Sequence, residues 1–198
     1  MTNLVVAMPA EARPLIEFFN LRKSGSLSSS KVFAGEGVWL VISGVGARAA
    51  RLAVERLSSR TGPYVDRCWV NVGVAGHADH ELGRAFLAAK IEDATTGRSW
   101  SPQVDFPHGL PTAEVRTVAR PEQRYDEDVL YDMEAAAFYE TAIRFSPREK
   151  VHVLKIVSDN LRRPVETVTA EAASQLVNQQ LPAVERLLTQ LERLSAVG

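Results

Sequence analysis

Residues 68–76 read CWVNVGVAG, an apolar run that passes into a glycine-rich turn. A run such as Cys68–Val72, in which Asn71 is the one polar residue and polar positions do not alternate, is typical of a strand buried on both faces. The same arrangement occurs at Val38–Ile42, which is followed by SGVG at residues 43–46. Two buried strands that each end in a glycine-rich turn favour a largely parallel sheet covered by helices.

Other segments extend this pattern along the chain. We expect further strands at Leu4–Met8, Ala85–Ile91, Val115–Ala119 and Val151–Val157, and helices through Leu15–Phe19, at Ala47–Leu57 and at Met133–Phe145. Apolar residues at alternating steps of four and three between Val177 and Leu191 predict a helix packed on the sheet, with a short coiled coil as the alternative. Serine-rich residues 24–30 predict a turn, and residues 95–111 predict a long loop. The sequence therefore indicates one α/β domain over residues 1–198, with a mainly parallel or mixed central sheet flanked by helices.

The composition narrows the classes of partner. Of 198 residues, 23 are Lys or Arg and 24 are Asp or Glu, so the net charge of −1 gives no overall field that would hold nucleic acid or an anionic membrane. The single cysteine, Cys68, excludes an internal disulfide framework. The amino terminus shows neither a basic leader nor an apolar stretch of membrane-spanning length. We expect a cytoplasmic protein that binds a small molecule and neither nucleic acid nor a membrane.

Three acidic residues follow apolar runs at the places where a parallel sheet binds its ligands. Glu11 comes after the first expected strand, Asp159 follows the strand at Val151–Val157, and Glu134 opens a helix. Ligands of such sheets gather beyond the carboxyl ends of the strands, so we expect these side chains to converge at one edge. Taken singly, each is also explained as a helix cap or a solvated carboxylate, because acidic residues favour helix starts.

Five short motifs stand at these expected strand ends and helix starts. They are VAMPAE at Val6–Glu11, SGVG at Ser43–Gly46, NVGVAG at Asn71–Gly76, DMEA at Asp132–Ala135 and VSD at Val157–Asp159. In this order they resemble the motifs of the nucleoside phosphorylase and nucleosidase superfamily, in particular of the methylthioadenosine/S-adenosylhomocysteine nucleosidases. The resemblance implies a nucleoside phosphorylase-like fold and cleavage of the N-glycosidic bond of a nucleoside or a nucleoside-like small molecule.

The resemblance also implies a role for each carboxylate. Breaking a ribosyl C–N bond builds positive charge on the sugar and negative charge on the leaving base. Asp159 corresponds to the general acid that protonates the purine N7, and for this it must carry a proton near neutral pH. Glu134 corresponds to the residue that grips the ribose hydroxyls, with Met133 packing against the sugar. Glu11 corresponds to the carboxylate that orients the attacking water.

Further implications concern the rest of the pocket and the assembly. The resemblance puts Ala75, Gly76 and Ser158 at the substrate. It calls for no cofactor. It implies a homodimer or a larger homo-oligomer, in which a neighbouring copy helps to close the substrate pocket.

The nucleophile decides between hydrolysis and phosphorolysis. A phosphate nucleophile requires cationic and amide donors, whereas water requires a base and an acceptor. Phosphorylases of this superfamily typically carry an arginine where this sequence has Asn71, so the resemblance favours hydrolysis. Gly46 and Arg48 leave a candidate phosphate or water pocket at a helix start, although Arg48 also fits as a surface residue after a glycine turn. A phosphate-dependent nucleoside phosphorylase is therefore the alternative.

The sequence departs from the family pattern in its middle. Val74 replaces the serine usual in the third motif, Arg84 replaces a common aspartate, and residues 94–133 form a shorter segment than in the nucleosidases. Because the base-recognition loop belongs there, the leaving base stays undetermined, and a non-catalytic nucleoside-binding protein is a second alternative. Positional candidates for contacting a base are Arg120, Glu122, Arg124 and Tyr125. For Tyr125, a surface position is preferred over stacking on a base.

A compact polar cluster follows the third motif. It consists of His77, Asp79, His80 and Glu81. Imidazole and carboxylate are common zinc ligands, but the cluster contains no cysteine and no ligand spacing fixed by a helix. We therefore expect no metal site.

Overall fold

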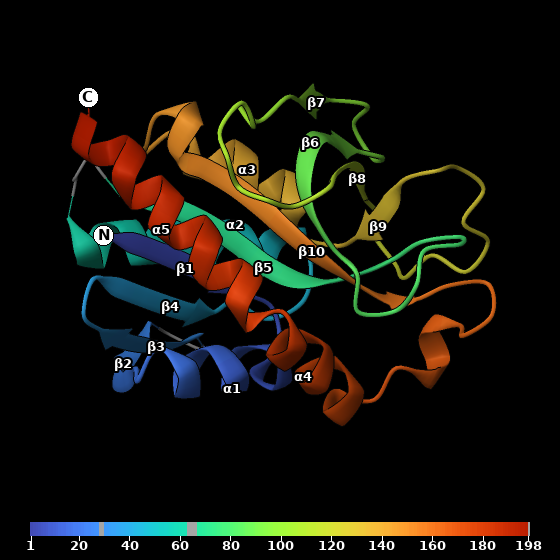
Figure 1. The fold of residues 1–198 in the computed structure, drawn as a ribbon, viewed down its shortest axis with the longest axis horizontal. Coiled ribbons are helices and arrows are strands. Elements are labelled where there is room, and N and C mark those ends of the chain that lie inside the picture. The colour runs from blue at the N-terminus through green and yellow to red at the C-terminus, as the bar shows by residue number, and fades with distance from the viewer. Residues whose placement is uncertain (28–29, 63–66, 198) are drawn as a thin grey trace.

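The computed structural model describes residues 1–27, 30–62 and 67–197, and Figure 1 shows how their elements are arranged. The strands are β1 (Thr2–Val6), β2 (Arg22–Leu27), β3 (Ser30–Gly35), β4 (Val38–Ile42), β5 (Cys68–Gly76), β6 (Ala85–Asp93), β7 (Ser99–Trp100), β8 (Thr112–Thr117), β9 (Leu130–Asp132) and β10 (Val151–Asp159). The helices are α1 (Pro9–Phe18), α2 (Ala47–Thr61), α3 (Ala135–Ala142), α4 (Ala170–Gln179) and α5 (Leu181–Val197), with 3-10 turns η1 (Arg148–Lys150) and η2 (Val165–Thr167). The described strands join into one 10-stranded sheet of mixed direction, which confirms the expected α/β class.

The parallel part of the sheet brings several strand ends to one edge. β1 lies between β4 and β5 and runs parallel to both. β10 runs parallel to β5, from Val151 beside Trp69 to Asp159 beside Gly76. β10 also pairs with β6, and the pairs β6–β8, β8–β9 and β9–β5 lead back to β5, so these five strands close into a ring. The carboxyl ends of β1, β5 and β10 meet at one edge, where parallel sheets bind their ligands.

Helices cover both faces of the sheet, with α1, α4 and α5 on one face and α2 and α3 on the other (Figure 1). Successive residues of a strand point to opposite faces. Leu4 and Val70 accordingly pack into the core beside Leu188 of α5, whereas Val5 packs into the core beside Leu57 of α2. Because both faces are buried, these strands carry apolar residues at successive positions, which explains the unbroken apolar runs.

The carboxy-terminal segment forms helices that pack on the sheet, as expected. It forms two helices, α4 and α5, which meet at Gln180. Val177 and Leu191 both lie in the core on that face of the sheet, so the spacing serves packing and not a coiled coil. Within the described ranges, the helices lack the combination of length and apolar character that a bilayer crossing requires.

The turn predicted at residues 24–30 is wrong for most of that segment. β2 and β3 pair there as an antiparallel hairpin at the edge of the sheet, while residues 28–29 lie outside the described residues. Polar residues are tolerated on an edge strand, so hydrophobic periodicity gives no signal. Gly25, at φ +123°, accommodates the irregular register between Lys23 and Gly25.

Several other predicted boundaries differ from the structure. The strand expected at Leu4–Met8 covers Thr2–Val6, and the strand expected at Val115–Ala119 covers Thr112–Thr117. β5 continues through residues 73–76, because Ala75 and Gly76 still pair with β10. The helix expected at Met133–Phe145 is shorter, since α3 covers Ala135–Ala142. The loop expected at residues 95–111 contains the short strand β7 and is otherwise irregular.

Candidate active site

A cavity of about 310 Å³ lies at the carboxyl ends of β1, β5 and β10. Its lining is mostly apolar but includes five carboxyl groups, which belong to Glu11, Glu122, Asp132, Glu134 and Asp159. The other predicted substrate residues that line it are Ala75, Gly76, Met133 and Ser158. The cavity therefore brings together the predicted acid, the predicted ribose-binding residues and the predicted base for water.

Asp159 lies at the end of β10, where the pairing with β5 shifts register after Val157. Its two carboxylate oxygens each accept a hydrogen bond, one from the Ser158 hydroxyl and one from the Tyr125 hydroxyl. A Cβ at position 76 would lie 2.3 Å from Asp159 Oδ2 and 2.6 Å from Tyr125 Cε1. Gly76 is thus needed because any side chain there would displace the carboxylate and the tyrosine ring.

Tyr125 is buried, so the preferred interpretation of it as a surface residue is wrong. The residue is 4 % exposed, and its ring meets that of Tyr131 edge-on, at 5.8 Å between centroids. Burial, together with the hydrogen bond to Asp159, raises the pKa of Tyr125 far above its ordinary value. The hydroxyl therefore keeps its proton and acts as a donor. Hydrophobic periodicity gives no signal for this position, because Tyr125 lies in a loop with left-handed backbone at φ +49°.

Glu11 lies in the first turn of α1 and points into the end of the sheet. Its Oε2 accepts a hydrogen bond from the Met8 amide at 2.8 Å, and its Oε1 accepts one from the Val74 amide at 2.9 Å. Burial raises the pKa of Glu11, although both backbone bonds and the neighbouring Lys155 oppose the shift. A carboxylate whose pKa is raised is a stronger base toward water.

Glu134 occupies the residue before α3. Its Oε1 accepts a hydrogen bond from the Gly46 amide at 2.6 Å, which links it to the turn after β4. Burial raises the pKa of Glu134 to about 7, while Lys155 counteracts part of this shift. At neutral pH the carboxyl is therefore near its midpoint, and a nearby positive charge would favour the ionised form.

A buried ion pair lies close to Glu11 and Glu134, and it was not predicted from the sequence. Lys155 Nζ lies 2.7 Å from Asp132 Oδ2, and both side chains are almost fully buried. Asp132 also accepts hydrogen bonds from the Thr117 hydroxyl at 2.7 Å and from the amides of Glu134 and Ala135 at 3.1 and 2.8 Å. Burial lowers the pKa of Lys155, but Asp132 and Glu134 outweigh this effect and the pKa is raised. A lysine inside an otherwise apolar strand is the sequence signal that could have found the pair.

The candidate phosphate or water pocket at Gly46, Arg48 and Asn71 is not assembled. Asn71 is buried within β5, and its side-chain amide donates to the carbonyl oxygen of Val5 at 3.0 Å. Arg48 is exposed on α2, and neither residue lines the cavity. The Gly46 amide is already bonded to Glu134, so an anion at this helix start would lie beside a carboxylate. Among the described residues that line the cavity, none is a lysine or an arginine.

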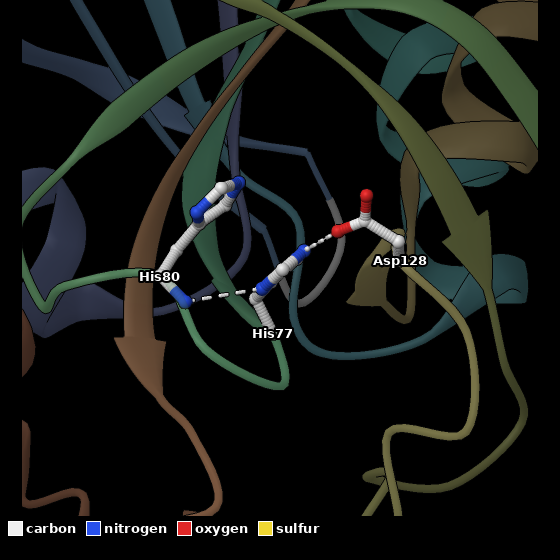
Figure 2. A group of neighbouring side chains, drawn as sticks. All are labelled: His77, His80 and Asp128. Carbon is white, nitrogen blue, oxygen red and sulfur yellow. Dashed lines mark hydrogen bonds and ion pairs between the residues drawn. The ribbon is translucent and has the colours of Figure 1, made fainter.

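Two of the four residues in the predicted polar cluster come together with a third from another segment. His77 and His80 lie beside Asp128, with one potential ligand atom of each residue within 4.8 Å of the others (Figure 2). The two imidazole rings are stacked at 3.8 Å between centroids and 15° from parallel. Nitrogen lone pairs lie in the ring plane, so stacked rings cannot both point to one ion at a bond length of about 2.0–2.1 Å. As arranged, the group forms hydrogen bonds and does not present a metal-binding geometry.

Solved structures with this fold include several nucleosidases. The chain matches the 5′-methylthioadenosine nucleosidase of Arabidopsis thaliana with a TM-score of 0.80 at 16% identity, covering 96% of this chain and 95% of that one. It matches a 5′-methylthioadenosine/S-adenosylhomocysteine nucleosidase of S. pneumoniae, solved with a transition-state inhibitor, with a TM-score of 0.76 at 18% identity, covering 96% and 99%. It matches the futalosine hydrolase of Helicobacter pylori with a TM-score of 0.77 at 11% identity, covering 95% and 97%. No family model and no curated protein matches the sequence. The likeness confirms the fold that the motifs imply.

Proposed function

We propose that this protein hydrolyses the N-glycosidic bond of a nucleoside or a nucleoside-like small molecule. The observation that carries the proposal is the convergence of Glu11, Glu134 and Asp159, from separate segments, on one mostly apolar cavity. Hydrolysis of a ribosyl C–N bond requires an acid for the base, an acceptor for the sugar and a base for water. These three side chains supply one group for each task.

Asp159 and Glu134 act on the two halves of the substrate. In its protonated form, Asp159 gives its proton to the leaving base as the C–N bond breaks, which removes the negative charge that would develop there. The carboxylate that remains accepts hydrogen bonds from the Tyr125 and Ser158 hydroxyls. Glu134 accepts hydrogen bonds from the ribose hydroxyls, and Met133 packs against the sugar. Since the pKa of Glu134 is about 7, positive charge on the ribose favours its ionised form, and the interaction strengthens toward the transition state.

Glu11 acts on the nucleophile. The water oxygen forms a bond to the sugar carbon that loses the base, and its proton passes to Glu11. Burial raises the pKa of Glu11, which brings the carboxylate closer to the strength needed to accept that proton near neutral pH. The products are the free base and the free sugar.

Water is favoured over phosphate by the charge of the cavity. Its described lining contains five carboxyl groups and no basic side chain. Phosphate sites depend on cationic side chains or on free backbone amides, and the nearby Gly46 amide is bonded to Glu134. A phosphate ion would therefore meet like charges without a compensating donor.

The solved nucleosidases support the same reaction class. One relative is a nucleosidase with a transition-state inhibitor and another is a futalosine hydrolase. A purine leaving base, assembly into a homodimer or larger homo-oligomer, and residence in the cytoplasm are further parts of the proposal. Assembly rests on the motif resemblance, because one exposed apolar residue at the cavity, Val45, does not by itself mark an interface. A monomer in light scattering would contradict that part.

The direct test is a panel of purine and pyrimidine nucleosides, incubated with and without inorganic phosphate. Free base and reducing sugar are then measured. We expect release of both at the same rate in either buffer. Release that strictly requires phosphate would replace hydrolysis by phosphorolysis, and binding without cleavage would favour a non-catalytic nucleoside-binding protein.

A further inference from the structure

The side chain of His77 connects the end of β5 to the loop at residues 118–129, which carries Tyr125. Its Nδ1 accepts hydrogen bonds from the amides of Asp79 and His80, each at 3.1 Å. An imidazole that accepts at Nδ1 carries its proton on Nε2. Nε2 therefore donates to Asp128 Oδ1 at 3.0 Å, as drawn in Figure 2.

The imidazole of His77 is fixed by stacking against a neighbouring ring. It stacks on His80, which in turn stacks on Phe86 at 4.6 Å between centroids. The side chain of His77 is almost fully buried, whereas that of Asp128 is 95% exposed. His77 is thus the buried partner of the contact, and Asp128 is its solvent-exposed partner on the loop.

The same histidine is bonded to the backbone of the proposed acid. The His77 amide donates to the carbonyl oxygen of Asp159 at 3.0 Å. The Tyr125 hydroxyl donates to the carboxylate of Asp159. Three hydrogen bonds and the chain itself therefore form a closed circuit. Asp159 is bonded to His77, His77 is bonded to Asp128, and Tyr125, in the same loop as Asp128, is bonded back to Asp159.

From this circuit we infer that His77 and Asp128 form a clasp that positions Tyr125 against Asp159, and thereby fixes the orientation of the acid. The inference rests on the proposed function, in which Asp159 protonates the leaving base. Tyr125 and Ser158 each hold one oxygen of the carboxyl, so the loss of either hydroxyl frees the group to rotate. His77, Asp128 and Tyr125 are positioning residues in this scheme.

Because Asp128 is exposed to solvent, its role in positioning Tyr125 can be distinguished from a role in the stability of the fold. A hydrogen bond to a solvent-exposed carboxylate contributes little to folding, so its removal should leave the fold intact. Tyr125, in contrast, has left-handed backbone at φ +49°, a conformation that persists only where surrounding contacts impose it. Release of the clasp should therefore act mainly on the loop around Tyr125.

The test compares Asp128→Ala with Asp128→Asn, which keeps an oxygen that accepts from His77. Asp126→Ala is the matched control, because Asp126 is an exposed carboxylate of the same loop. With a nucleoside that the wild type cleaves, we expect Asp128→Ala to lower kcat roughly 10-fold, with KM within about twofold, since small misplacement of a reacting group slows chemistry more than binding. Asp128→Asn should restore most of the rate, and Asp126→Ala should match the wild type.

A double-mutant cycle with Tyr125→Phe tests whether Asp128 acts through the tyrosine. If it does, Asp128→Ala has no further effect in the Tyr125→Phe background. Additive losses would overturn the clasp, and so would an Asp128→Ala variant with wild-type kcat.

Amide hydrogen exchange of residues 118–129 tests the clasp independently of turnover. We expect faster exchange in Asp128→Ala than in Asp126→Ala. If the wild type cleaves no nucleoside, the proposed function fails, and equal exchange in the two variants would then overturn the clasp as well. Loss of loop protection in the wild type on treatment with EDTA would also overturn it, in favour of a metal site.

Discussion

Two cavities of similar volume differ in the solvent exposure and the pKa of the charged residues that line them. The cleft between α1 and α4 has a volume of about 380 Å³, and its charged residues include Arg13 and Glu171. These two side chains are more than half exposed and lie 3.2 Å apart as a surface ion pair. In the cavity of about 310 Å³ at the strand ends, Glu11 and Glu134 are buried and their pKa values are raised.

The difference shows that volume alone does not mark an active site. Solvated and paired charges in the cleft cost little to keep. Buried carboxyl groups cost free energy of folding unless they are hydrogen-bonded or paired. A group of them in one cavity with raised pKa values is therefore a sign of function. Changes in the cavity should alter activity or stability strongly, and changes in the cleft should not.

The largest expected effect is on turnover in the Asp159→Asn variant. Loss of the proposed acid should lower kcat by about 10²- to 10⁴-fold, the usual contribution of general acid catalysis. The thermal midpoint should change by no more than about 3 °C, because the amide keeps the shape of the side chain. Glu171→Gln, in the cleft, is the control and should retain wild-type kcat. Wild-type-like turnover by Asp159→Asn would refute the assignment of the acid.

The next effect is on stability in the Lys155→Met variant. Removing one partner of a buried ion pair leaves Asp132 uncompensated, which should lower the free energy of unfolding by about 3 to 5 kcal/mol. Urea denaturation measures this change. The double variant Lys155→Met/Asp132→Asn should regain part of the loss. A decrease below about 1 kcal/mol for Lys155→Met would show that the pair does not carry charge in the folded protein.

The third effect is a pH dependence of stability centred on Glu134. The folded-state pKa of about 7 exceeds the ordinary value of 4.5, so ionisation of Glu134 opposes folding. Its contribution to stability is complete below about pH 4.5 and is lost as the pH rises through 7. Glu134→Gln should match the wild type near pH 4 and exceed its free energy of unfolding by on the order of 1 to 3 kcal/mol at pH 8. An equal difference at both pH values would contradict the raised pKa.

The smallest effect is expected in the cleft. Arg13→Ala breaks a surface ion pair, so the free energy of unfolding should change by less than about 1 kcal/mol. Its kcat should stay at the wild-type value. A drop of more than about tenfold in kcat would mean that the cleft takes part in the reaction.

The sequence predicted that three of the five carboxyl groups of the cavity would converge, because each of the three lies beside the end of an apolar run. Asp159 ends a buried strand, Glu11 follows another, and Glu134 precedes a helix. In a parallel sheet these positions meet by topology, so local patterns were sufficient to group them. The same reasoning predicted the buried strands, whose apolar residues face cores on both sides of the sheet.

The remaining parts of the site depend on contacts between segments, and no local pattern identifies both partners of such a contact. The approach of Tyr125 to Asp159 depends on a left-handed residue in a loop and on a glycine in β5. The partnership of Lys155 with Asp132 joins residues from β10 and β9, and no spacing in the sequence relates them. The edge hairpin of β2 and β3 escaped prediction because its polar strand has no buried periodicity.

The most direct test of the central claim is a crystal structure of the Asp159→Asn variant with a nucleoside that the wild type cleaves. The account predicts a nucleoside in the cavity at the strand ends, with a ring nitrogen of the base in hydrogen-bonding distance of the side chain at position 159. It also predicts the ribose hydroxyls against the Glu134 carboxylate. A nucleoside bound in the cleft between α1 and α4, or bound in the cavity with its ribose away from Glu134, would contradict it.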